Sequence, residues 1–73
     1  MNRSMIHVQY RDGSRPRGTK VTLGFSAGLT RPAFTDGHGL AIVEHASTGT
    51  ATVYVGGKGR GSFHAPGTFV VTL

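Results

Sequence analysis

The sequence predicts an all-β domain, a small Greek-key β-sandwich of about seven short strands with no substantial helix. Three observations lead to this prediction. Apolar and polar residues alternate along several short runs, which is the period of a strand that buries one face. Turn-forming residues, mainly Gly, Asp, Ser and Pro, interrupt these runs at spacings of about eight to twelve residues. No window of helical length shows helical periodicity.

Two strands, at residues 5–10 and 20–25, are expected in the first third of the chain. Their apolar residues recur at every second position: Ile6, Val8, Tyr10, Val21, Leu23 and Phe25. An Asp-Gly pair after the first strand marks a turn, and Pro16 cannot donate a ladder hydrogen bond in the segment that follows. The loop at 26–31 holds one apolar residue, Leu29, which is expected to cap an end of the core.

The stretch at 35–45, T-D-G-H-G-L-A-I-V-E-H, is the element around which we expect the chain to be organised. A short edge strand at 33–35 follows a proline and leads into an Asp-Gly reversal. The strand that leaves the reversal, at 40–45, breaks the alternation because its first four residues are all apolar. Either both faces of this strand are covered, or one of them is an exposed apolar strip.

Three more strands are expected at 50–55, 60–64 and 68–73. Glycines at 56 and 57 suit a tight hairpin, because they accept the positive φ that such turns need. The residues expected to face the core are Ala51, Val53, Val55, Phe63, Phe69, Val71 and Leu73, while Thr52 and Tyr54 face outward. Strand pairing cannot be read from one chain, so a sandwich and a small barrel both remain open.

Length and composition indicate one domain, residues 1–73, with 1–4 as a flexible N-terminal tail. A domain of this size buries only about 60% of the surface that its unfolded chain exposes. It has no cysteine for disulfides, so self-association or docking onto a larger assembly is expected to supplement the core. No run approaches the roughly 20 apolar residues of a membrane span, and no signal peptide is visible. The default expectation is a cytoplasmic protein without a membrane partner.

Three sequence markers together resemble the carboxypeptidase regulatory-like domains. The first, D-G-x-P-x-x-G before A-x-V-x-L, is matched by Asp12, Gly13, Pro16 (one residue late), Gly18, Val21 and Leu23. The second, T-D-x-x-G before alternating apolar residues, is matched by Thr35, Asp36, Gly39, Ala41 and Val43. The third, P-G-x-[YF]-x-V-x-[VL], is matched by Pro66, Gly67, Phe69, Val71 and Leu73. The resemblance covers residues 6–73.

The resemblance implies a transthyretin-like (prealbumin-like) or immunoglobulin-like sandwich whose first two strands form a hairpin. Family members are mostly non-catalytic accessory, adhesive or structural modules, and such domains often pair through edge strands. The resemblance also implies that Ala41 and Val43 face the core, which leaves Leu40 and Ile42 on the outer face. These two residues, with Tyr54, form the expected protein interface unless the loop at 26–31 covers them. The G-G-K-G-R-G-S-F hairpin and the positive charge depart from the family pattern.

No catalytic, metal or cofactor site is expected. The serines lie in or beside expected turns, and none sits in a G-x-S-x-G motif. Two of the three carboxylates are in Asp-Gly-type turns, where Asp serves the backbone. The four histidines, His7, His38, His45 and His64, show no metal-ligand spacing. The glycine cluster at 57–61 lacks the G-K-[ST] ending of a phosphate-binding loop.

Eight Lys and Arg against three acidic residues give a net charge of +5, which favours an acidic partner. Six of the basic residues fall in or beside expected turns: Arg11, Arg15, Arg17, Lys20, Lys58 and Arg60. If those turns share one end of the fold, they form an anion or nucleic-acid patch, with Tyr10, Tyr54 and Phe63 available for base stacking. The leading hypothesis is a non-enzymatic structural or protein-interaction module, for which a homodimer is one expected form. The alternative is a small basic nucleic-acid-binding domain.

Overall fold

The computed structural model describes all 73 residues as eight strands in two packed sheets. This confirms the predicted all-β, sandwich-like fold, and no segment is a helix that could cross a membrane. The strands are β1 (Asn2–Gln9), β2 (Lys20–Phe25), β3 (Gly28–Leu29), β4 (Ala33–Phe34), β5 (Leu40–His45), β6 (Gly49–Val55), β7 (Lys58–Ala65) and β8 (Thr68–Thr72).

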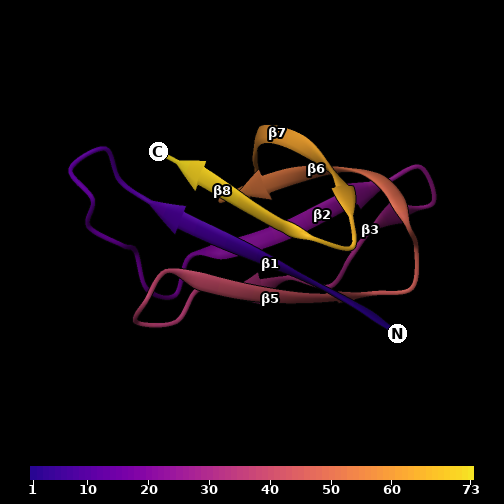
Figure 1. Ribbon diagram of the computed structural model, residues 1–73, viewed down its shortest axis with the longest axis horizontal. Helices are drawn as coiled ribbons and strands as arrows, with labels where there is room; N and C mark the ends of the chain where they lie inside the picture. Colours follow the sequence, from indigo (N-terminus) through magenta and orange to yellow (C-terminus); the bar gives the residue numbers. More distant parts are fainter.

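The smaller sheet, sheet A, has the strand order β5-β1-β8. Its central strand β1 runs antiparallel to β5 and parallel to β8. The larger sheet, sheet B, has the order β3-β2-β6-β7, and β4 pairs with the same edge of β2 as an additional short strand. Figure 1 shows β1 between β5 and β8, with β2 crossing behind it in the other layer.

The connection between β1 and β2 corrects one expectation. These strands were expected to form a hairpin, but β1 lies in sheet A and β2 in sheet B, so residues 10–19 cross from one sheet to the other. The crossing loop does not pair with a strand. Hydrogen bonds connect it to Thr35, at the start of the β4–β5 turn. The Gly18 N–H donates to the Thr35 carbonyl (2.8 Å), and the Thr35 hydroxyl donates to the Pro16 carbonyl (2.8 Å).

Two further expectations fail at strand ends. Residues 1–4 were expected to be a tail, yet β1 begins at Asn2, and Ser4 is fully buried. The loop expected at 26–31 contains a short strand, β3, and its Leu29 is 70% exposed instead of capping the core. Leu29 stays exposed because β3 pairs only with the edge of β2 and nothing packs on its outer side.

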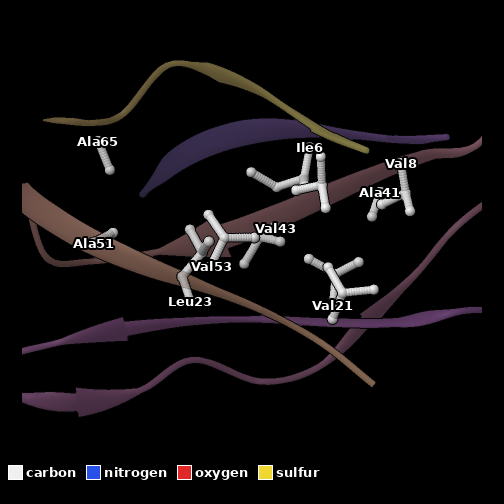
Figure 2. Packing of buried hydrophobic residues seen from close by; sticks show 11 residues of the cluster. Ile6, Val8, Val21, Leu23, Ala41, Val43, Ala51, Val53 and Ala65 are labelled. Carbon is white, nitrogen blue, oxygen red and sulfur yellow. The ribbon is translucent and has the colours of Figure 1, made fainter. Parts of the chain in front are cut away.

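The core lies between the sheets and takes every second residue of most strands (Figure 2). Its buried apolar residues are Ile6, Val8, Val21, Leu23, Ala41, Val43, Ala51, Val53, Val55, Ala65 and Val71. Phe25, Phe63, Phe69 and Leu73 are partly buried against this cluster. The predicted alternation is therefore confirmed in the expected strands except at two positions: Thr22, on the outward-facing set of β2, is buried, and Tyr10 is 45% exposed. Tyr10 follows the last residue of β1 and lies in the crossing loop, where its N–H donates to the Ser14 carbonyl.

The predicted hairpin at 56–57 joins β6 to β7. Val55 pairs with Lys58, and Gly56 and Gly57 both adopt positive φ, 60° and 85°. Two central residues with positive φ define a type I′ turn, whose twist matches that of the flanking strands. This turn sends β7 back along β6 as an edge strand of sheet B.

Truncation of Leu23 tests whether the core lies between the two sheets. Leu23→Ala is expected to lower the free energy of unfolding by about 3 kcal/mol, because it leaves a cavity at a fully buried position. Leu29→Ala makes the same change at an exposed residue of sheet B and is expected to cost less than about 0.5 kcal/mol. Urea unfolding followed by circular dichroism measures both, and equal losses would contradict the assigned core.

Candidate functional site

The outer face of sheet A carries an apolar patch, here called the sheet A patch, formed by Met5, Leu40, Ile42 and Val70 around His7. The strand register brings these residues together: Met5 lies opposite Ile42, and His7 lies between Leu40 and Val70. The side chains of Met5, Ile42 and Val70 are 43%, 50% and 55% exposed, and Leu40 is half-buried. Three large, exposed apolar side chains thus gather on one small face of the domain.

The expected interface residues do not form one surface. Leu40 and Ile42 lie on the outer face of sheet A, and the exposure of Ile42 shows that no loop covers it there. Tyr54 lies on β6 in sheet B, where it pairs in register with Thr22 and is half-buried. A Cβ at Gly24 would lie 2.8 Å from the Tyr54 ring, so this ring packs on the glycine backbone. Tyr54 is therefore separated from the sheet A patch by the thickness of the sandwich.

The six basic residues lie in three segments: the crossing loop after β1, the first residue of β2, and the start of β7. Hydrogen bonds link these segments to one another and to the β4–β5 turn. The Gly56 N–H in the β6–β7 turn donates to the Lys20 carbonyl (2.9 Å), and the Arg15 guanidinium donates to the His38 carbonyl (3.2 Å). All six basic residues are exposed: Arg11, Arg15, Arg17, Lys20, Lys58 and Arg60. We call this set the basic end.

The carboxylates at the basic end are engaged by their own loops. Asp36 accepts hydrogen bonds from the N–H groups of Leu40 (3.1 Å) and His38 (2.8 Å), and these bonds lower the pKa of Asp36 below its ordinary value. Asp12 accepts from the hydroxyl and the N–H of Ser14, which lower the pKa of Asp12 in the same way. Both carboxylates therefore stabilise turns, and Arg15 is the one basic side chain here that makes a hydrogen bond within the chain.

The expected stacking aromatics are not gathered beside these charges. Phe63 is half-buried and stacks on Phe69, with ring centroids 5.4 Å apart. Tyr54 lies on the outer face of sheet B. Tyr10 is the one exposed ring in the crossing loop, next to Arg11. Phe34, which is 60% exposed, lies opposite Lys20 in the β2–β4 register, so the basic end offers two exposed aromatic side chains, Tyr10 and Phe34.

A buried polar chain joins β1 and β5, at one end of sheet A, to the β7–β8 turn, and the sequence analysis missed it. The His45 Nδ1–H donates to the Ser47 carbonyl (2.7 Å), because a carbonyl can only accept. His45 Nε2 therefore accepts from the Ser4 hydroxyl (2.7 Å), and Ser4 Oγ accepts from the Gly67 N–H (3.3 Å). Ser4 is fully buried, so its hydroxyl faces the interior and not a substrate. Strand alternation could have found the pair, since Ser4 shares the parity of Ile6, and His45 that of Val43.

A groove of about 630 Å³ opens along one side of the sandwich, between β5 and the β3–β4 segment. One wall is formed by residues 42–47, and the other by residues 27–33. Phe25 also lines the groove and packs against the His45 ring, with the ring centroids 5.1 Å apart and the ring planes tilted by 37°. The lining mixes apolar side chains with Arg31 and Glu44. No group of three or more His, Asp or Glu side chains is placed to hold a metal ion anywhere in the structure.

Comparisons with known proteins give no further identification: no protein-family profile, no curated protein and no solved structure matches this chain.

The loop role of Asp36 leads to a pH prediction. Asp36→Asn is expected to lower the thermal midpoint at neutral pH, and this difference is expected to vanish in acid. The folded protein favours the carboxylate form, so its contribution is complete above the unfolded pKa of about 4 and is lost as the pH falls through the lower folded pKa.

Thermal unfolding followed by circular dichroism between about pH 7 and pH 2 measures this difference. Glu44→Gln controls for the change in net charge, because the Glu44 carboxylate accepts no hydrogen bond from a side chain or loop. If the difference in thermal midpoint between wild type and Asp36→Asn stayed constant down to the lowest pH, the stabilisation would not depend on the charge of Asp36.

Proposed function

We propose that this protein is a non-enzymatic β-sandwich module that works by protein–protein contact through the sheet A patch. The exposed cluster of Met5, Ile42 and Val70 supports this proposal, because isolated exposed apolar residues are common but a contiguous group on a small domain is not. The patch is also nearly neutral. In register, Arg3 lies beside Glu44 at its border, and the excess positive charge lies at the basic end.

The finer assignment, also a proposal, is a transthyretin-like module of the carboxypeptidase regulatory-like kind. Two packed sheets and the T-D-x-x-G reversal before β5 support it. The missing hairpin between β1 and β2 departs from the pattern on which the resemblance was based. In such modules the sandwich supplies a rigid surface and the contact chemistry resides in its faces and edges.

The simplest partner for the sheet A patch is a second copy, so self-association is the direct test. Light scattering on a size-exclusion column is expected to show the mass rising with concentration above that of one 7.7 kDa chain. Added salt is expected to leave this rise unchanged, because burial of apolar surface does not depend on counterions. Val70→Lys, combined with Met5→Lys, is expected to weaken the association by at least about tenfold, since two charges would be desolvated.

Thr50→Lys combined with Ser62→Lys is the matched control, because it adds two lysines at exposed positions of β6 and β7 in sheet B. The association constant of this control is expected to equal that of the wild type. A wild type that remains a monomer at every concentration, or a control variant that dissociates as readily as the patch variant, would contradict the sheet A patch as a self-contact.

A second candidate function, binding of nucleic acid or another polyanion, is favoured by the basic end. Its six basic side chains are exposed, and the two nearby carboxylates are engaged by their own turns. A cluster of this kind attracts phosphate groups without sequence preference. The exposed rings of Tyr10 and Phe34, which lie next to Arg11 and opposite Lys20, are available for base stacking.

Arg17→Ala with Lys58→Ala tests the second candidate, and Arg3→Ala with Arg31→Ala removes the same charge away from the basic end. Binding of a labelled single-stranded oligonucleotide is measured by fluorescence anisotropy at several salt concentrations. The basic-end variant is expected to flatten the slope of log affinity against log salt by about 1.4, at about 0.7 per phosphate contact. Equal effects of the two double variants would show that net charge alone attracts the oligonucleotide.

A further inference from the structure

The open edge of β5 exposes backbone hydrogen-bonding groups. The Leu40 N–H donates to Asp36 Oδ1 (3.1 Å), and the Leu40 carbonyl accepts from the Asp36 N–H (2.9 Å), both on the side away from β1. Gly39 instead bonds to β1, through its carbonyl and the Val8 N–H (2.8 Å). Strand alternation therefore directs the N–H and carbonyl groups of Ile42 and Glu44 away from β1.

No strand of the protein forms hydrogen bonds with these outward N–H and carbonyl groups. β5 is the terminal strand of sheet A and pairs only with β1. The groove runs along this edge, with Ile42 and Glu44 in its wall. Among the polar side chains of this wall, His45 already has both ring nitrogens bonded. The free hydrogen-bonding groups of the wall are therefore the outward backbone groups of β5 together with the exposed Glu44 carboxylate.

The opposite wall supplies apolar contacts. Ala27, Pro32 and Ala33 line this wall, and Phe25 also lines the groove. Leu29 borders the wall, but it pairs with Gly24, and its side chain lies against the outer face of sheet B. A strand placed beside β5, at the usual spacing of about 4.8 Å, would direct alternate side chains toward this wall and the others toward the outer face beside Ile42. Groove-facing positions therefore require apolar side chains.

We propose that the groove binds an extended peptide segment, which adds to sheet A as a strand beside β5. This inference rests on the proposed function, protein binding, and names the partner. A free segment fits better than the edge of a second folded copy, because the groove is walled on both sides, by residues 42–47 and 27–33. The net charge of +5 favours a segment with acidic residues flanking its apolar positions. Pairing through an exposed sheet edge is an established mode of peptide recognition.

A synthetic peptide of alternating valine and threonine, flanked by glutamates and carrying a fluorescent label, is the probe. When the full chain is titrated into the labelled peptide, the fluorescence anisotropy of the peptide is expected to rise and reach a plateau. The same peptide, N-methylated at alternate amides, keeps every side chain but loses the donors of one edge. Either edge of the peptide can pair with β5, so two peptides are made, one methylated at the odd amides and one at the even amides. One of the two is expected to bind at least about tenfold more weakly than the unmethylated peptide.

Ile42→Pro removes the outward N–H at position 42 and leaves the ladder to β1 intact, because that N–H does not take part in it. It is expected to weaken peptide binding by about tenfold, whereas Ile42→Thr keeps the N–H and is expected to retain more affinity. If Ile42→Pro does not fold, the binding site is instead located on the wild type, from the amide chemical shifts that change when the peptide is added. Peptide-induced shifts are expected at residues 42–47 and 27–33.

Val70→Lys separates this inference from the proposed function, since Val70 lies on β8, at the far edge of sheet A from β5. Peptide binding is expected to survive Val70→Lys even where self-association does not. The inference is overturned if the wild type does not bind the probe, if both N-methylated peptides bind as tightly as the parent, or if the shifts map elsewhere. It is also overturned if Ile42→Pro, and not Val70→Lys, abolishes self-association, because a second copy would then occupy the β5 edge.

Discussion

The turn from Thr35 to Gly39 is the constraint on which the two-sheet arrangement depends. A Cβ at Gly39 would collide with the Val8 carbonyl oxygen, and Gly39 has a φ of 75°, so only glycine lets the turn approach β1 this closely. That approach fixes the register of β5 on β1 through the bond between the Val8 N–H and the Gly39 carbonyl. The same turn holds the crossing loop, because the buried Thr35 hydroxyl donates to the Pro16 carbonyl and accepts from the Thr19 N–H. One turn thus joins sheet A to the segment that enters sheet B.

The unequal sheets explain where the candidate sites lie. β4 packs beside β5 near the turn, but β3 is too short to continue that contact, so the sandwich opens between β5 and the β3–β4 segment. On its opposite side, the β7–β8 turn joins the edges of the two sheets. The chain through Ser4 and His45 ties β1, β5 and that turn together, and every buried side-chain polar atom has a hydrogen-bond partner. The groove is therefore bordered by a satisfied, rigid interior on one side and a free strand edge on the other.

The sequence predicted the elements well because alternation is a local property, set by which residues one strand buries. It could not predict the partners of each strand. The crossing of residues 10–19 depends on hydrogen bonds to Thr35, and no pattern within the loop reveals those bonds. Tyr10 was misplaced for the same reason, since alternation does not show where β1 ends. The expected interface failed in part because Leu40 and Tyr54 were grouped by their outward direction, whereas the two sheets direct them to opposite faces.

The separation of charge from apolar surface determines how the proposed contacts combine. Six of the eight positive side chains belong to the basic end, while the sheet A patch and the groove lie along β5 and its neighbours, where Arg3 and Arg31 are accompanied by Glu44. At physiological salt the Debye length is about 8 Å, shorter than the 34 Å length of the molecule, so an anion at the basic end is screened from the far part of the groove. Long-range attraction to an acidic partner therefore acts mainly on the rate of encounter. The hydrogen bonds of β5 and the contacts of Ile42 and Phe25 would then set how long that partner stays. An extended segment paired with β5 would also bring its outward side chains beside Ile42, which makes the sheet A patch and the groove one continuous surface.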